Sequence, residues 1–309
     1  MTRTTRTFLM LGAVLAAASI TVPTSARAQS DRSRVDTTFA FGKNGAVDLG
    51  LVSGEIIVTG WTRAEAKVNA WVERGTLDVS FSSGHISVQT RSQRHNLGEA
   101  RYEVMVPIGT RVTAHAVSGD IRIKATAGEV EAQSVSGDIE VLDATNRVTI
   151  NAVSGNAHVA NVRGSVKYEA VSGDFESEDI TGDIDAHTVS GEITARGARS
   201  AHFRAETVSG DISYRGSIDA AGTYDISSHS GDVTLEIPNG AGANLALQSY
   251  SGEINSRFPM TLQPGQNTGT RRGRRMEFTI NGGGARVTVE TFSGDITIER
   301  GASRTSKEN

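Results

Sequence analysis

The feature that most constrains the fold of this chain is a tetrapeptide, Val-Ser-Gly-Asp or a close variant, that returns at a fixed interval. Copies begin at Val117, Val135, Val153, Val171, Val189 and Val208, and the first five are spaced by 18 residues. Such a period is typical of repeat architectures, in which each unit buries its apolar face only by stacking on its neighbours. The repeat therefore predicts an elongated stack of similar coils.

Apolar or small residues recur within each repeat at positions 0, 4, 6, 9, 13 and 15, counting the leading valine as 0. In the second unit these are Val135, Ile139, Val141, Ala144, Val148 and Ile150. The pairs at 4/6 and 13/15 show the alternation of short half-buried strands, and no helical period is visible. We expect all six positions, including the leading valine, to face the core, and each coil to consist of two similar halves.

Glycine occupies position 2 of the repeat, and glycine or asparagine is frequent at position 11. Because these residues accept positive φ, both positions are predicted to be corners of the coil. The position-2 corners are Gly119, Gly137, Gly155, Gly173, Gly191, Gly210 and Gly231. Short strands between such corners predict an all-β fold, a single-stranded parallel β-helix or β-roll solenoid. Its coils have about 18 to 21 residues, each stacked on the next in sequence, and its handedness stays open.

The regularity of the repeat divides the chain into segments. We expect a signal peptide at residues 1–28, a less regular N-terminal β cap at 29–112, solenoid repeats at 113–300 and a disordered tail at 301–309. An insertion loop is expected at 256–276, where the interval between repeats lengthens. In the cap, Lys67–Val72 and Tyr102–Val106 are predicted to pair as strands that cover the open end of the stack.

Residues 1–28 have the pattern of an export signal. Arg3 and Arg6 precede an apolar run from Phe8 to Ile20, and Ala26-Arg27-Ala28 fits a cleavage site, so we expect cleavage after Ala28. The run of about 13 residues is short of the roughly 20 needed to span a bilayer. The mature chain is therefore expected in the periplasm, or secreted to the cell surface, without a transmembrane segment.

Charge and cysteine content exclude several classes of protein. The chain has no cysteine, so disulfides, lipid attachment through cysteine and thiolate chemistry are absent. The formal charge of −4 becomes about −7 when the leader, with three arginines and no acidic residue, is removed. A mildly acidic chain argues against nucleic acid as a partner.

Four stretches of the chain resemble a known family of exported bacterial β-strand-repeat proteins. These are Gly54 to Trp61, Tyr102 to Pro107, the Ser-Gly-Asp series, and Gly282 to Ile298. The family is catalogued as a domain of unknown function, and its members are often labelled "putative adhesins". The resemblance covers nearly the whole mature chain and implies a fold, whereas it implies no specific activity.

An acidic column follows the corner glycines. Its aspartates are Asp120, Asp138, Asp174, Asp211 and Asp232. Stacked in register, their carboxylates would lie roughly 5 Å apart and could collect calcium, which takes oxygen ligands. Alternatively, each aspartate accepts a hydrogen bond from nearby turn amides.

No residue pattern in the sequence indicates catalysis. A nucleophilic serine is normally one residue activated by one base, whereas the serines from Ser118 to Ser209 are repeated copies that are better explained by bonds to the turn backbone. The histidines share no repeat position and lack metal-binding spacing. We therefore predict no catalytic residue and no cofactor.

The densest basic run is Arg271, Arg272, Arg274 and Arg275, within the expected insertion loop. It could contact anionic envelope components such as lipid head groups or acidic glycans, or it could be a solvated loop.

Together these observations predict a non-enzymatic, exported envelope or adhesion-type binding or scaffold protein. Its partner would be an envelope component, a glycan or a protein. Two alternatives stay open. One is an envelope-stress component that binds cationic peptides through the acidic edge, and the other is a carbohydrate-active enzyme on a β-helix, which would need non-repeated polar residues in a groove.

Overall fold

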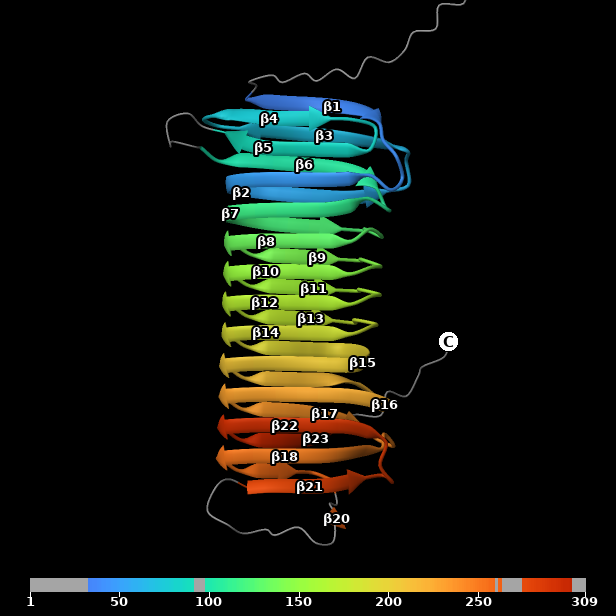
Figure 1. The fold of residues 1–309 in the computed structure, drawn as a ribbon, viewed down its shortest axis with the longest axis vertical. Coiled ribbons are helices and arrows are strands. Elements are labelled where there is room, and N and C mark those ends of the chain that lie inside the picture. Colours follow the sequence, from blue (N-terminus) through green and yellow to red (C-terminus); the bar gives the residue numbers. More distant parts are fainter. Residues whose placement is uncertain (1–32, 92–97, 259–260, 263–273, 302–309) are drawn as a thin grey trace, which may run out of the picture.

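The chain forms a long stack of β-strands with no helix in its described part (Figure 1). This computed structural model describes residues 33–91, 98–258, 261–262 and 274–301. Within these ranges 23 strands, β1 to β23, hydrogen-bond into one continuous sheet that winds along the long axis. The predicted all-β solenoid is confirmed. The signal peptide predicted at residues 1–28 lies outside the described residues.

The regular coils pair in parallel with the 18-residue register that the repeat predicts. Val148 pairs with Val130 on one side and with Val166 on the other. Two stacks of strands alternate along the chain, the longer strands on one side of the coil and the shorter ones on the other. The strands are β7 (Arg111–Lys124), β8 (Val130–Ser136), β9 (Ile139–Leu142), β10 (Val148–Ser154), β11 (Ala157–Ala160), β12 (Val166–Ser172), β13 (Phe175–Glu178), β14 (Ile184–Ser190), β15 (Ile193–Ser209) and β16 (Ile212–Ser230).

The core is a column of side chains enclosed by the coils. Alternation along each strand buries Val148 and Ile150 and turns Thr149 and Asn151 outward. Aromatic rings take the same inward positions in later coils, where Tyr168 stacks on Phe175 with ring centroids 4.7 Å apart. Burial raises the pKa of Tyr168 to about 12, and its hydroxyl donates a hydrogen bond to the carbonyl of Gly173.

The leading valine of the repeat does not face the core, and this part of the prediction is wrong. Val135 and Val153 are 49% and 48% exposed, while the residues before them, Ser134 and Ala152, are buried. Positions 13, 15 and 17 of one unit are the inward side of a strand, so the next valine is one step past the last inward residue. The two halves of a coil are therefore not equivalent.

The second corner also differs from the prediction. Positive φ occurs at position 8 of the unit, at Ala125, Asp143, Asn161 and Asp179, rather than regularly at position 11. Arg163 then bridges to Thr181, and Thr181 bridges to Arg199, so each coil has a third, very short side.

The N-terminal end inserts a strand out of sequence order. Strand β2 (Ala46–Trp61) lies between β6 and β7 and is parallel to both. The predicted pairing of Lys67–Val72 with Tyr102–Val106 is confirmed as the antiparallel pair β3–β6. The strands that cover this end are β1 (Arg34–Ala40), β3 (Glu65–Val72), β4 (Thr76–Phe81), β5 (His85–Arg91) and β6 (Ala100–Pro107).

The C-terminal end also contains strands that are inserted out of sequence order. The last coil, β22 and β23, is inserted between β16/β17 and β18/β19. The expectation that each coil stacks on the next in sequence is therefore wrong here. Antiparallel β21 covers this end (Figure 1). These strands are β17 (Val233–Pro238), β18 (Ala243–Ser251), β19 (Ile254–Ser256), β20 (Thr261–Leu262), β21 (Arg274–Ile280), β22 (Ala285–Ser293) and β23 (Ile296–Gly301). In the described ranges no helix is long and apolar enough to cross a membrane.

Candidate functional site

The corner glycines form a ladder in which each backbone lies directly on the one before. Gly155 has φ of +132°, and a Cβ built on it would lie 2.3 Å from the carbonyl oxygen of Gly137. Positive φ is likewise found at Gly137, Gly173, Gly191, Gly210 and Gly231, and at Gly119 the obstacle is the carbonyl oxygen of Gly54, 2.3 Å away. Any side chain at this column would push adjacent coils apart, so the glycines are structural.

The acidic column makes hydrogen bonds from coil to coil. The amide of Asp138 donates to Asp120 Oδ1 at 3.1 Å, and the amide of Asn156 donates to Asp138 Oδ1 at 2.9 Å. Asp174 and Asp211 accept the amides of Glu192 and Asp232 in the same way, at 2.8 Å each. One oxygen of each of these aspartates thus satisfies a backbone N–H at the corner.

Calcium binding by this column stays a prediction. Among the residues that the structure describes, no group of three or more acidic, histidine or cysteine side chains is gathered as a metal site. The structure does provide contacts for the alternative, in which each aspartate accepts a hydrogen bond from a backbone amide of the turn.

The repeated serines serve the corner through their backbones. The amides of Gly137 and Gly155 donate to the carbonyls of Ser154 and Ser172, at 3.3 and 3.2 Å. The side chains of Ser136, Ser154 and Ser172 are exposed.

The arginine run is divided by the structure. Arg271 and Arg272 lie outside the described residues. Arg274 and Arg275 begin β21, where their backbones pair with Ser249 and Gln248, so this half of the run belongs to a strand rather than to a loop.

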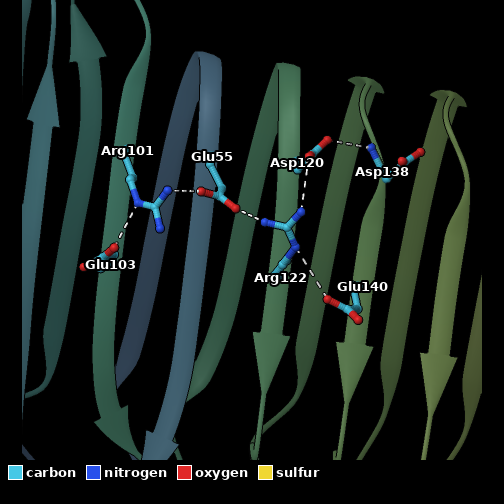
Figure 2. A network of polar contacts seen from close by, with 7 residues as sticks. All are labelled: Glu55, Arg101, Glu103, Asp120, Arg122, Asp138 and Glu140. Atoms are coloured by element: carbon cyan, nitrogen blue, oxygen red, sulfur yellow. Dashed lines mark hydrogen bonds and ion pairs between the residues drawn. The ribbon is translucent and has the colours of Figure 1, made fainter.

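An ion-pair network fixes the inserted strand β2 to its neighbours (Figure 2). Glu55 on β2 lies between Arg101 on β6, at 2.6 Å, and Arg122 on β7. Arg122 also approaches Glu140 on β9 at 3.6 Å. Glu55 is 19% exposed, more enclosed than its partners. The network therefore links strands that are far apart in sequence, a structural role.

The outward valines define an apolar stripe. They stack in register from coil to coil, and the same column continues at the C-terminal end with aromatic side chains. In spatial order the apolar stripe consists of Val52, Val117, Val135, Val153, Val171, Val189, Val208, His229, Phe292 and Tyr250. Its apolar members are between 38% and 53% exposed. At about 4.8 Å per coil the stripe is about 43 Å long.

Rings in the stripe stack on each other rather than presenting flat faces. His229 and Phe292 are nearly parallel, at 9°, with centroids 4.8 Å apart, and Tyr250 follows Phe292 at 5.3 Å. Because the spacing is close to that of neighbouring strands, Phe292 has one ring on each of its two faces. A sugar ring stacks on an exposed aromatic face, so these rings are better suited to continuing the ridge of valines.

A groove runs beside the apolar stripe. Its floor consists of the small residues before each stripe position, such as Ala116 and Thr188, and its far wall is the outward column two residues before the stripe. The far wall comprises Gln89, His115, Gln133, Asn151, Glu169, His187, Glu206, Ser227, Glu290 and Gln248. Two hollows lie along it, of about 450 Å³ in the N-terminal half and 600 Å³ in the C-terminal half.

The far wall of the groove changes character along its length. The N-terminal half presents amides and an imidazole, whereas the C-terminal half presents Glu169, Glu206 and Glu290. His187 lies between Asp185 and Glu206, at 2.6 and 3.1 Å. Burial acts to raise the pKa of the Glu206 carboxyl, but the hydrogen bond from Arg204 and the nearby His187 bring it below its ordinary value. The C-terminal half is thus anionic.

These features define a class: a single-chain β-solenoid with a lengthwise apolar stripe and groove as its most developed surface. The chain belongs to the Toastrack family (DUF4097), whose model matches residues 54–217 and 204–299. This membership confirms the family expected from the sequence. No protein with a curated description is similar to the chain in sequence.

Three solved structures with distant sequences resemble the chain over most of its length. A "putative lipid binding protein" from Parabacteroides distasonis is 11% identical, with a TM-score of 0.49 over 87% of this chain and 97% of that one. A "putative adhesin" from Bacteroides fragilis is 13% identical, with a TM-score of 0.39 over 87% and 98%. A "putative cell adhesion protein" from Clostridium sporogenes is 10% identical, with a TM-score of 0.29 over 87% and 100%.

Proposed function

We propose that this protein is an exported, non-enzymatic binding or scaffold protein of the cell envelope, and that the apolar stripe is its docking surface. The observation that carries the proposal is the continuity of the stripe. Seven valines and two aromatic side chains, each roughly half exposed, amount to roughly 700 Å² of apolar side-chain surface. The largest apolar patch on a typical monomer is about 300–600 Å² and is often functional.

The polar residues of the groove favour binding over catalysis. They occur one per coil in a single column, so each is a copy of its neighbours in position. A catalytic centre needs a particular nucleophile or acid beside a base that activates it. Export is supported by the leader predicted for residues 1–28, and the proposal places the mature chain in the periplasm or at the cell surface.

The docking surface can be tested with two arginine substitutions on the stripe, Val153→Arg and Val171→Arg in one chain. Both side chains are exposed, so the fold is expected to persist. Thr145→Arg is the matched control, because Thr145 is also β-branched and exposed but lies on the short third side of the coil.

Immobilised mature chains would be exposed to solubilised envelope fractions and to glycan arrays. We expect the wild type and the Thr145→Arg control to retain the same bound components, and the stripe variant to lose them. Equal retention by all three chains would refute the stripe as a docking surface, and so would a wild type that binds neither these components nor another molecule of the same chain.

A further inference from the structure

We infer that the partner on the apolar stripe is a second copy of this chain, packed antiparallel; this rests on the proposed function of the stripe as a docking surface. The first argument is spacing. The stripe repeats once per coil, at about 4.8 Å, whereas same-face residues of an extended peptide repeat at about 6.8 Å and helix turns at 5.4 Å. A partner that contacts every coil in the same way must itself be a stack of strands.

The second argument is symmetry. The apolar stripe stands as a ridge beside a groove whose floor holds small residues, including Ala116, Ser134 and Ala152. A two-fold axis perpendicular to the solenoid, in the plane of the interface, places each column opposite itself, so the stripe of one copy lies on the stripe of the other and the two far walls face each other. An isologous interface requires such a self-complementary surface.

Charge along the groove sets the direction of packing. A parallel pair would bring Glu290 and its acidic neighbours to the same end of the interface as those of the other copy. An antiparallel pair places Glu290 opposite His115 and Glu206 opposite Asn151, so these carboxylates face an imidazole and an amide. Amide groups can donate hydrogen bonds to carboxylates, whereas like charges opposed across an interface are unfavourable.

The same packing matches large side chains to small ones. With ten positions on the stripe, the two-fold axis passes between Val171 and Val189. Phe292 then lies opposite Val117, and Tyr250 lies opposite Val52. The stripe alone offers roughly 700 Å² per copy, close to the approximately 800 Å² per partner of a standard stable interface.

The association is tested by sedimentation of the mature chain over about 1–100 μM, a range that brackets micromolar affinity. We expect a dimer for the wild type and for Thr145→Arg. Val171→Arg with Val189→Arg brings four arginines together near the axis, so its dissociation constant should rise at least 100-fold. Unchanged circular dichroism would show that this variant is folded.

Orientation is tested by cysteine pairing, because the natural chain has no cysteine. A Val117→Cys chain mixed with a Phe292→Cys chain should form the mixed disulfide, since Cα atoms must approach within about 7 Å. Preferential pairing of Val117→Cys with itself would overturn the antiparallel interface.

A monomeric wild type over the whole range would overturn the inference. If such a monomer still captures envelope components that Val153→Arg with Val171→Arg does not, the occupant is a different partner and the proposed function stands. If it captures nothing, both proposals fall. A dimer that survives the Val171→Arg and Val189→Arg substitutions would also overturn the stripe as its interface.

Discussion

Replacing Gly155 by alanine should be among the most damaging small changes to this solenoid. The residue has φ of +132°, and its new Cβ would lie 2.3 Å from the oxygen and 2.8 Å from the carbon of the Gly137 carbonyl. Both atoms belong to backbone, so no side chain can rotate away. The coils must separate locally by several tenths of an ångström or more.

The cost has two parts. The backbone conformation alone costs an alanine about 1–3 kcal/mol. Separation also weakens the hydrogen bond from the Gly137 amide to the Ser154 carbonyl, at 3.3 Å, which crosses this gap and is worth about 0.5–1.5 kcal/mol. We therefore expect the free energy of unfolding to fall by about 1.5–4.5 kcal/mol.

Urea denaturation followed by circular dichroism measures this loss. Gly84→Ala is the matched control, because a Cβ at Gly84 meets nothing within 4 Å and its backbone is not in the positive-φ region. The control should change stability by less than about 0.5 kcal/mol. Equal midpoints for the two variants would refute the account of the glycine ladder.

Three further predictions follow from other contacts. Glu55→Gln should lower the free energy of unfolding by about 1–2 kcal/mol because it breaks two ion pairs around a partly enclosed carboxylate. The control Glu103→Gln, which breaks an exposed ion pair, should lower it by less than about 0.5 kcal/mol in the same urea assay. Asp138→Ala should lower the free energy of unfolding by about 1 kcal/mol. Asp138→Asn should leave it nearly unchanged, because an amide oxygen still accepts the hydrogen bond from the Asn156 amide. Equal losses for the two variants would show that the charge of Asp138 matters instead. The pKa of Tyr168 is raised to about 12 in the folded chain. The stabilisation of the fold that comes from its neutral phenol is therefore complete below about pH 10 and is lost as pH rises towards 12. Melting temperatures of Tyr168→Phe should fall less over that range than those of the wild type.

The sequence was most informative where structure is periodic. The 18-residue interval predicts the register of β8 to β14, and the 13/15 alternation predicts the inward side chains Val148 and Ile150. The corner glycines were found because only glycine tolerates both the positive φ and the close backbone of the adjacent coil.

The valines that form the candidate binding surface were predicted on the wrong side of their strands, in the core. The leading valine is apolar and so suggests a core position. Since positions 13, 15 and 17 face inward, however, the alternation along the strand places the next valine outward, and the sequence already contained this signal. The grouping of His229, Phe292 and Tyr250 could not be read in the same way. It depends on β22 entering between β16 and β18, a pairing of residues 42 to 63 positions apart that no local pattern encodes.

Because β2 and the β22–β23 coil each lie inside the stack and are covered by strands nearer the end, neither end can be lengthened by adding another repeat there. Growth is possible in the middle, where one 18-residue unit can be duplicated without disturbing either closure. Each duplication would extend the rod by about 4.8 Å and lengthen the apolar stripe by one side chain. The number of internal 18-residue units thus determines the length of the molecule.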